Sequence, residues 1–280
     1  MIFQSYQPVP ALKEFVKAFR IRHFIIPRGM KTHPKPYPPH PENCITFYVK
    51  GRELKELLSD GSSIEPPRSV VTGQFTYRVN RSALMPEHLM ILVAFKPGAL
   101  YKITGIPSSE LVNRHIDLED IYPEKARKVN DALQYCHGYS EMIGVIESFL
   151  LELLVHVKVS TQLFENAFHL IAAQPAAYSM DWIAGQACLS PRQFERKSAD
   201  YLGISPKLFA RIAKFHQSFC MRLKQPARKW FDIAIDSGYY DYQHLVRDYN
   251  EFASATPNEI FNEEAKSLDK ALGLSGKIIT

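Results

Sequence analysis

The 280-residue sequence lacks the features of several protein classes. Its four cysteines, Cys44, Cys136, Cys188 and Cys220, form no Cys-x-x-Cys pair, so we expect free thiols in a reducing cytoplasm. No apolar run reaches the ~20 residues that a membrane-spanning helix needs, and no membrane partner is predicted. No basic segment followed by an apolar one opens the chain, so no signal peptide is predicted.

Sequence signals for catalysis are also missing. The 13 glycines form no phosphate-binding loop, and no Ser/His/Asp order or paired-carboxylate spacing stands out. The ten histidines raise the hypothesis of a metal site, since His33, His40 and Glu42 share one loop. However, no His-x-His pair occurs on a predicted strand. We therefore predict no enzyme, no metal and no cofactor.

Positive charge is concentrated in one stretch. The net charge is only +5, but ten Lys or Arg side chains lie between Arg192 and Lys229 against two acids. Between Phe231 and Phe261 there is one basic residue against six acids. A charge run is often only a solvated helix face, but a run of cations on one side of a helix is also typical of contacts with phosphates.

The first 158 residues are predicted to form an antiparallel barrel or sandwich followed by helices. Turn signals separate short runs rich in β-branched and aromatic residues. A short helix is expected at Pro10–Phe19, and the proline-rich stretch Lys31–Pro41 is expected to be an extended loop. The predicted strands are Arg20–Ile26, Cys44–Val49, Ser69–Thr72, Thr76–Val79 and Leu89–Phe95.

Helices are expected after this β region. Short ones are predicted near Pro107–Asn113 and at Leu118–Ile121, and longer ones at Pro123–Cys136 and Ser140–Val157. The last carries an apolar stripe from Ile143 to Val157 at helical spacing. Such a stripe either packs in the core or is partly exposed as a contact between two copies of the chain.

The C-terminal part contains one pattern written twice. Ile183-Ala184 and Ile233-Ala234 lie 50 residues apart, and each pair is followed by a turn and a second helix. Ser190 and Asp241 are the predicted caps of these second helices. A long helix from Ser205-Pro206 to about Lys224 connects the two copies. Each copy therefore predicts a helix-turn-helix unit, and the residues past Glu264 are expected to form a frayed tail.

This region, from about Gln162 to Phe261, resembles the DNA-binding region of the AraC/XylS family of bacterial transcription regulators. The most specific match is the stretch from Gly238 to Tyr249, followed by Thr256-Pro257. The family usually has an aromatic residue at the position of Ser198, a small residue at Cys188 and Gly at Ser254. The β region ending at Phe95–Leu100 resembles the cupin-like N-terminal domain of some of these regulators.

The resemblance implies a division into two domains. Residues 1–158 would form a cupin-like sensory and dimerisation domain. Residues 162–264 would bind DNA through units at about 179–202 and 229–252. The implied partners are double-stranded DNA, a second copy of the chain, RNA polymerase and a small-molecule effector. In the alternative interpretation, the chain is a cupin-like ligand-binding protein whose helical repeat is a protein-interaction module.

The family's DNA-contacting positions carry over to specific residues. On the first unit, Glu195 could instead pair with Arg192, and on the second Arg247 could cap its own helix or hold a phosphate. The predicted base contacts are Arg192, Gln193, Glu195, Arg196, Tyr242, Gln243, Val246 and Arg247. The predicted phosphate contacts are Lys197, Lys207, Arg211, Lys214, Arg228 and Lys229.

The interior of the barrel leaves two interpretations open. A barrel of this size can hold one small ligand or be filled by its own side chains. The aromatic residues that would line it are Phe24, Phe47, Tyr48, Phe75, Tyr77 and Phe95. No effector-binding residue is predicted.

Overall fold

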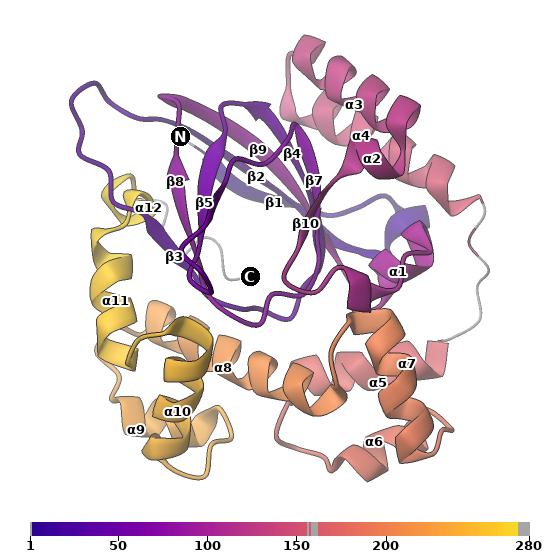
Figure 1. The fold of residues 1–280 in the computed structure, drawn as a ribbon, viewed down its shortest axis with the longest axis vertical. Helices are drawn as coiled ribbons and strands as arrows, with labels where there is room; N and C mark the ends of the chain where they lie inside the picture. Colours follow the sequence, from indigo (N-terminus) through magenta and orange to yellow (C-terminus); the bar gives the residue numbers. More distant parts are fainter. Residues whose placement is uncertain (1, 156, 158–161, 274–280) are drawn as a thin grey trace.

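The chain folds into a β-rich part and a helical part that lie against each other (Figure 1). The computed structural model describes residues 2–155, 157 and 162–273. The β-rich part is a barrel of two antiparallel sheets, and the helical part carries two helix-turn-helix units on one long helix. The predicted α+β fold is confirmed. The predicted junction at residues 158–161 lies outside the described residues.

The barrel consists of a six-stranded and a four-stranded sheet. The strand order is β1-β2-β9-β4-β7-β10 in the larger sheet and β3-β8-β5-β6 in the smaller one. The bounds are β1 Ile2–Tyr6, β2 Val16–Ile25, β3 Lys35–Tyr37, β4 Cys44–Lys50, β5 Glu53–Leu57, β6 Ser63–Ile64, β7 Ser69–Thr72, β8 Val79–Ala83, β9 Glu87–Phe95 and β10 His115–Asp117.

Strand pairing corrects two local expectations. The predicted helix at Pro10–Phe19 is only the 3-10 turn η1, Pro10–Leu12, because β2 begins at Val16 and pairs with β9 along its length. Val16, Phe19 and Ile21 are fully buried, which stabilises the extended form over the helix. The proline-rich loop contains the short edge strand β3, where Pro36 needs no amide donor.

Helices pack on the larger sheet and close its core. Ile143, Ile146 and Phe149 of the apolar stripe are buried there, so the core interpretation of the stripe is the one that the structure shows. The exposed Leu151 and Val155 lie outside the stripe's buried positions. The helices are α1 Ala99–Thr104, η2 Ser108–Glu110, α2 Leu118–Ile121, α3 Pro123–Tyr135 and α4 Tyr139–Leu154.

The two helix-turn-helix units repeat each other at the level of backbone hydrogen bonds. The amide of Leu189 donates to Ala184, and the amide of Tyr239, 50 residues on, donates to Ala234. The units surround a second core, separate from that of the barrel. The helices are α5 Gln162–Ala173, α6 Met180–Gln186, α7 Pro191–Leu202, α8 Pro206–Lys224, α9 Trp230–Asp236, α10 Tyr242–Ala253, α11 Pro257–Lys266 and α12 Leu268–Ala271.

The three residues of the repeat that differ from the family's usual ones are each accommodated by the local structure. Cys188 has φ 54° at the turn where the second unit has Gly238 with φ 80°, and Ser254 ends α10 with φ 50°. Both therefore adopt the left-handed conformation that favours glycine. Ser198 is fully buried, and its hydroxyl donates to the carbonyl of Ile204 at 2.7 Å. Helix α10 thus ends at Ser254 in the left-handed conformation, without the Gly that the family usually has there.

The last described helices, α11 and α12, return to the barrel, which corrects the expectation that residues 265–273 form a frayed tail. Helix α11 continues to Lys266, and α12 places Asp269 in the interior, where it is fully buried. There its carboxylate pairs with Arg22 of β2 and, at 2.7 Å, with Lys35 of β3. A buried ion pair thus fastens the helical part to the barrel. Residues 274–280 lie outside the described residues.

Asp269→Ala should destabilise the protein strongly. The change leaves Arg22 and Lys35 buried without this carboxylate, and breaking a buried pair costs about 3–5 kcal/mol. The matched control is Asp236→Ala, which breaks an ion pair with Arg228 in which the aspartate is half exposed and should cost less than about 1 kcal/mol. Urea unfolding measures both, and equal losses would show that α12 does not hold the barrel.

Candidate functional site

The two candidate DNA-reading helices, α7 and α10, are joined by α8. This connector has 19 residues and is therefore about 28 Å long. Its Phe209 contacts Phe168 of the first unit at a ring separation of 5.7 Å. Its Phe215 contacts Tyr249 of the second unit at 4.7 Å. In Figure 1 the units lie at the two ends of α8, on the side away from the barrel.

The first recognition helix, α7, presents a polar face. Phe194 and Ser198 are buried, whereas Arg192, Glu195 and Arg196 are exposed. Gln193 completes a capping box, because its side-chain oxygen accepts from the amide of Ser190 at 3.0 Å. Among the described residues, Arg192 and Glu195 form no ion pair with each other. They therefore remain available to a partner.

The second recognition helix, α10, is capped by Asp241 and buries Leu245 and Tyr249. Gln243 and Arg247 are exposed, while Tyr242 and Val246 are half-buried. Arg247 takes part in no ion pair within the described part of the chain. The predicted base-contacting residues of α10 thus divide into two that reach solvent and two that also support packing.

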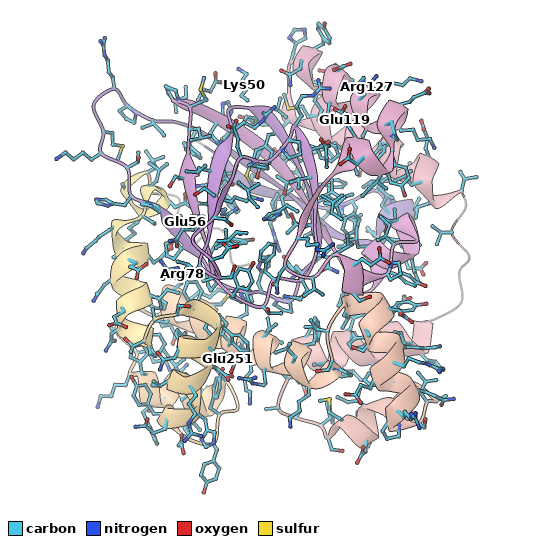
Figure 2. All side chains as sticks on the ribbon, in the orientation of Figure 1. Lys50, Glu56, Arg78, Glu119, Arg127 and Glu251 are labelled. Atoms are coloured by element: carbon cyan, nitrogen blue, oxygen red, sulfur yellow. The ribbon has the colours of Figure 1, made fainter. Side chains whose placement is uncertain are left out.

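The six predicted phosphate contacts have different surroundings. Arg211 joins α8 to α10 through Asp248 at 2.6 Å and Glu251 at 2.5 Å, so its charge is already engaged. Glu251 is labelled in Figure 2. The ammonium groups of two other residues lie over aromatic rings, Lys197 over Phe164 and Lys214 over Tyr239, and Arg228 pairs with Asp236. Lys207 and Lys229 are exposed and enter no ion pair in the described ranges.

Both units are also fastened to the barrel. The hydroxyl of Ser108 donates to the carbonyl of Tyr201, at the end of α7, at 2.9 Å. Gly203 follows with φ 84°, and a Cβ there would lie 2.5 Å from the Ser108 carbonyl oxygen. On the other side Arg78, labelled in Figure 2, donates to the carbonyl of Ala253 and pairs with Glu263 of α11. The barrel therefore constrains the positions of both helix-turn-helix units.

The barrel interior holds a cluster of charged side chains that sequence reasoning did not find. Glu53 is fully buried and accepts from Arg22 at 2.8 Å and from the Tyr48 hydroxyl at 3.4 Å. Although burial opposes ionisation, Arg81, His88 and Arg22 lower the pKa of Glu53 to about 2. Glu53 and Lys55 are buried at alternating positions of β5. Charged residues at alternating positions of a strand usually indicate its solvent-exposed face, so the sequence pattern did not predict this buried cluster.

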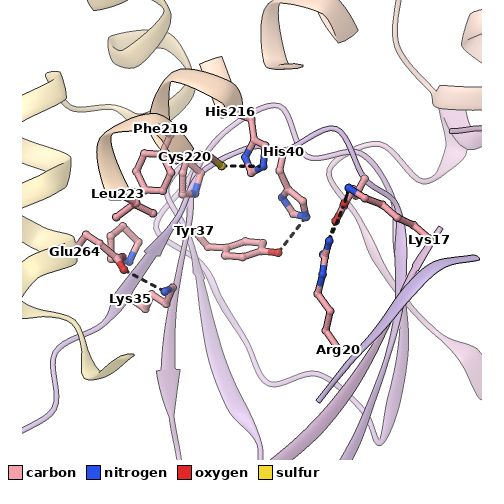
Figure 3. A pocket seen from close by; sticks show the side chains of 13 residues that line it. Lys17, Arg20, Lys35, Tyr37, His40, His216, Phe219, Cys220, Leu223 and Glu264 are labelled. Carbon is pink, nitrogen blue, oxygen red and sulfur yellow. Dashed lines mark hydrogen bonds and ion pairs between the residues drawn. The ribbon is translucent and has the colours of Figure 1, made fainter. Parts of the chain in front are cut away.

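Two adjoining chambers lie next to this cluster. The outer one, between the barrel and α8, has a volume of about 100 Å³ and is shown in Figure 3. The inner one, inside the barrel, has a volume of about 40 Å³. They share the wall formed by Tyr37 and His40, whose side chains are hydrogen-bonded at 3.0 Å. His40 also lies 5.9 Å, ring to ring, from His216 of α8.

The metal hypothesis finds no support in the geometry of its residues. Glu42 is bonded by Arg20 at 2.6 Å and by Lys17 at 2.5 Å, and His40 is bonded to Tyr37. Within the described residues, no group of three or more His, Cys, Asp or Glu side chains could hold a metal ion. In the same residues, no helix is long and apolar enough to cross a membrane.

Several buried histidines are held neutral. Burial lowers the pKa of His40 and of His88 to about 4 and that of His216 to about 3. Burial, together with the positive charge of Lys55, also lowers the pKa of His115. Each of these side chains takes up a proton in the unfolded chain near pH 6.5 but stays neutral in the fold, so acid favours unfolding.

The stability of the protein should therefore fall as the pH is lowered from 7 to 5. In this window the unfolded chain binds more protons, so the free energy of unfolding drops by up to roughly 1.4 kcal/mol per pH unit for each buried histidine. His88→Phe should reduce that slope, because the ring of His88 is fully buried between Phe24 and Tyr48. Urea unfolding at several pH values measures it.

The exposed His137 supplies the control for this experiment. His137→Gln should leave the slope unchanged, because folding does not bury the His137 ring. A stability that stays flat between pH 7 and pH 5 would contradict neutral burial of the four rings.

The arrangement thus defines a barrel joined to a tandem pair of helix-turn-helix units. Residues 4–117 match the family model described as a domain of unknown function, DUF6597. No curated protein matches the chain.

Among solved structures the chain is similar to ToxT from Vibrio cholerae, an AraC-family regulator. A 1.65 Å structure is 10% identical, with a TM-score of 0.49, covering 88% of this chain and 99% of that one. A structure with bound unsaturated fatty acid is 13% identical, with a TM-score of 0.48, covering 89% and 96%.

Proposed function

We propose that the protein is a sequence-specific DNA-binding transcription regulator of the AraC/XylS type and not an enzyme. The supporting observation is the presence of two helix-turn-helix units on one connector, each with an exposed polar face on its second helix. Arg can bond guanine through two hydrogen bonds, and Gln can do the same with adenine. Arg192 and Arg196 on α7, and Gln243 and Arg247 on α10, supply these groups.

The distribution of charge supports unequal roles for the two units. Exposed cations flank α7 and the start of α8, whereas α10 and its neighbours are mainly acidic. Non-specific attraction to phosphates then comes mostly from the first unit. The second unit adds base contacts through few residues. A homodimer, contact with RNA polymerase, control by a small molecule and a cytoplasmic location complete the proposal.

One observation favours a second candidate, a ligand-binding protein whose repeat binds another protein. Phe231 and Ile235 are both exposed on α9, in the acidic second unit. Apolar side chains exposed on one helix are typical of a protein contact. The absence of DNA binding at low salt, on any fragment near the protein's own gene, would favour this candidate over the regulator.

DNA binding should weaken as the salt concentration rises, and Lys207→Ala should make this dependence less steep. Each neutralised phosphate adds roughly 0.9 to the slope of log affinity against log salt. Lys207 is exposed at the start of α8, so its loss should weaken all sequences alike and reduce the slope by about one. Lys128→Ala, an exposed lysine on α3 of the barrel part, should change neither. Fluorescence anisotropy at several salt concentrations distinguishes the two variants.

Gln243→Ala should instead relax base preference. Loss of a two-bond contact with adenine costs about 1–3 kcal/mol of discrimination at one position, while affinity for unrelated sequences stays nearly constant. Binding to a randomised pool, followed by sequencing, measures this. If Gln243→Ala and Lys207→Ala both weaken every sequence equally, α10 does not read bases.

One protomer should protect about 17–20 base pairs. Two recognition helices on one connector are expected to meet successive major grooves, whose centres lie ~10–10.5 base pairs apart. Phe215→Gly should remove one of the two protected grooves, because Phe215 is fully buried against Tyr249 and Phe252 of the second unit. Footprinting with parallel circular dichroism measures both effects. Protection of a single groove by the unchanged protein would contradict the tandem arrangement.

A further inference from the structure

Arg211, on the connector helix α8, binds two carboxylates of the second recognition helix, α10. Its Nε and Nη2 atoms donate to Oδ1 of Asp248 at 3.3 and 2.6 Å. Its Nη1 and Nη2 atoms donate to Oε1 and Oε2 of Glu251 at 3.0 and 2.5 Å. A planar guanidinium held by several hydrogen bonds has little freedom to rotate. The contact therefore fixes the direction of α10 on α8 as well as its distance.

The contact continues into the interior of the second unit. Asp248 is buried, and its other oxygen, Oδ2, accepts from the Tyr239 hydroxyl at 3.0 Å. Tyr239 lies in the turn before α10, and the ammonium group of Lys214 on α8 lies 4.7 Å from the centre of its ring. Connector, turn and recognition helix thus meet at one carboxylate. We refer to Arg211, Asp248, Glu251 and Tyr239 as the Arg211 joint.

The first unit is held differently at the corresponding positions. Ser198 and Tyr201 stand there, 50 residues before the two acids of the joint. The Ser198 hydroxyl donates within its own unit, to the carbonyl of Ile204. The Tyr201 ring contacts the ring of Tyr101 in α1, with 4.6 Å between the ring centres. Uncharged contacts therefore place the first recognition helix, whereas charge holds the second one to the connector.

The same contacts leave Arg211 poorly suited to the phosphate contact that its sequence position predicts. Its single positive charge faces two carboxylates, so no excess positive charge is left to attract a phosphate. Four of the five N–H donors of its guanidinium are already in use. Arg211 is better placed to orient α10 than to hold DNA.

The direction of α10 matters because two DNA half-sites have to be met at once. Each base pair between them changes their separation by ~3.4 Å and rotates one against the other by ~36°. The two units also touch each other directly. A Cβ at Gly238 would lie 2.3 Å from the Cβ of Ala176, in the segment between α5 and α6. The units therefore have no room to approach further, and a rigid joint fits one arrangement of half-sites.

We propose that Arg211 is a positioning residue that makes the protein select bipartite DNA sites with one half-site spacing. It acts through Asp248 and Glu251, which set the direction of α10, and it does not itself contact DNA. This inference rests on the proposed DNA-binding function. It adds a specificity that no base-contacting residue provides, namely the number of base pairs between the half-sites.

Arg211→Met tests the joint on a set of DNA sites. The preferred site, selected from a randomised pool, is lengthened or shortened by one base pair between its half-sites. A further site has the second half-site scrambled. The unchanged protein should lose about 5- to 150-fold in affinity on either altered spacing, the loss expected when α10 misses a two-bond base contact.

The variant should bind the altered spacings as well as the original one, because a loosened joint lets α10 follow its half-site. Scrambling that half-site should still weaken it, because α10 continues to read bases. Fluorescence anisotropy measures both affinities. A spacing preference retained in Arg211→Met would overturn the proposal. So would a salt slope lowered by about one, since Arg211 would then hold a phosphate.

Insensitivity of Arg211→Met to the scrambled half-site would mean that the second unit has lost its fold. Arg211→Met combined with Asp248→Asn then repeats the comparison, because it removes the buried carboxylate together with its cation. The same insensitivity in the combined variant would contradict a positioning role. A failure of the proposed function is visible separately, since the unchanged protein would then bind none of the sites.

Arg68→Met is the matched control. Arg68 likewise bridges two carboxylates, Glu119 at 2.8 Å and Asp131 at 2.7 Å, and its side chain is 37% exposed against 33% for Arg211. It lies in the barrel part, so its loss should lower Tm by a similar amount and leave the spacing preference unchanged.

Hydrogen exchange without DNA tests the joint itself. The amides of α10 should exchange faster in Arg211→Met than in the unchanged protein, while those of α7 should exchange at the same rate, because local opening follows the local contacts. Arg68→Met should alter neither helix. Equal exchange of α10 with and without Arg211 would show that the joint does not hold this helix, and the proposal would fail.

Discussion

The packing of helix α8 is the constraint on which the rest of the structure depends. One 19-residue helix supplies Phe209 to the core of the first unit and Phe215 to that of the second. The same helix turns His216 and Cys220 toward the outer chamber at the barrel. Since interiors are densely packed, a movement of α8 against the barrel changes both units together. The spacing of the two recognition helices and their contact with the barrel therefore both depend on α8.

The buried charges of the barrel do more than contribute to its stability. Buried ion pairs are on balance weak contributors, because desolvation offsets much of their attraction. Here they do two things that apolar packing would not. Asp269, bonded to Arg22 and Lys35, fixes where the end of the helical part docks. Glu53 of β5, paired with Arg22 of β2 and Arg81 of β8, joins the smaller sheet to the larger one across the interior.

The sequence predicts the helical part far better than the barrel interior. Helices α6 and α7 follow from local signals, since Ser179 caps the first, Ser190 caps the second and the apolar period marks their buried face. Strand β5 was missed because Glu53 and Lys55 are polar at inward positions, which contradicts the usual alternation. The pairing of Arg22 with Asp269 joins residues 247 positions apart, which no local pattern encodes. The eight residues predicted to contact bases stay predictions. Six of them are exposed on the two recognition helices: Arg192, Gln193, Glu195, Arg196, Gln243 and Arg247.

The two chambers and the connector form one continuous path of contacts. Tyr37 and His40 separate the inner chamber from the outer one, and His40 lies against His216 on α8. A ligand can shift an equilibrium only through contacts that differ between two states. The shared wall supplies such contacts, because a displaced His40 ring must change its packing on His216. That change also alters how α8, the helix that joins the two helix-turn-helix units, packs on the barrel.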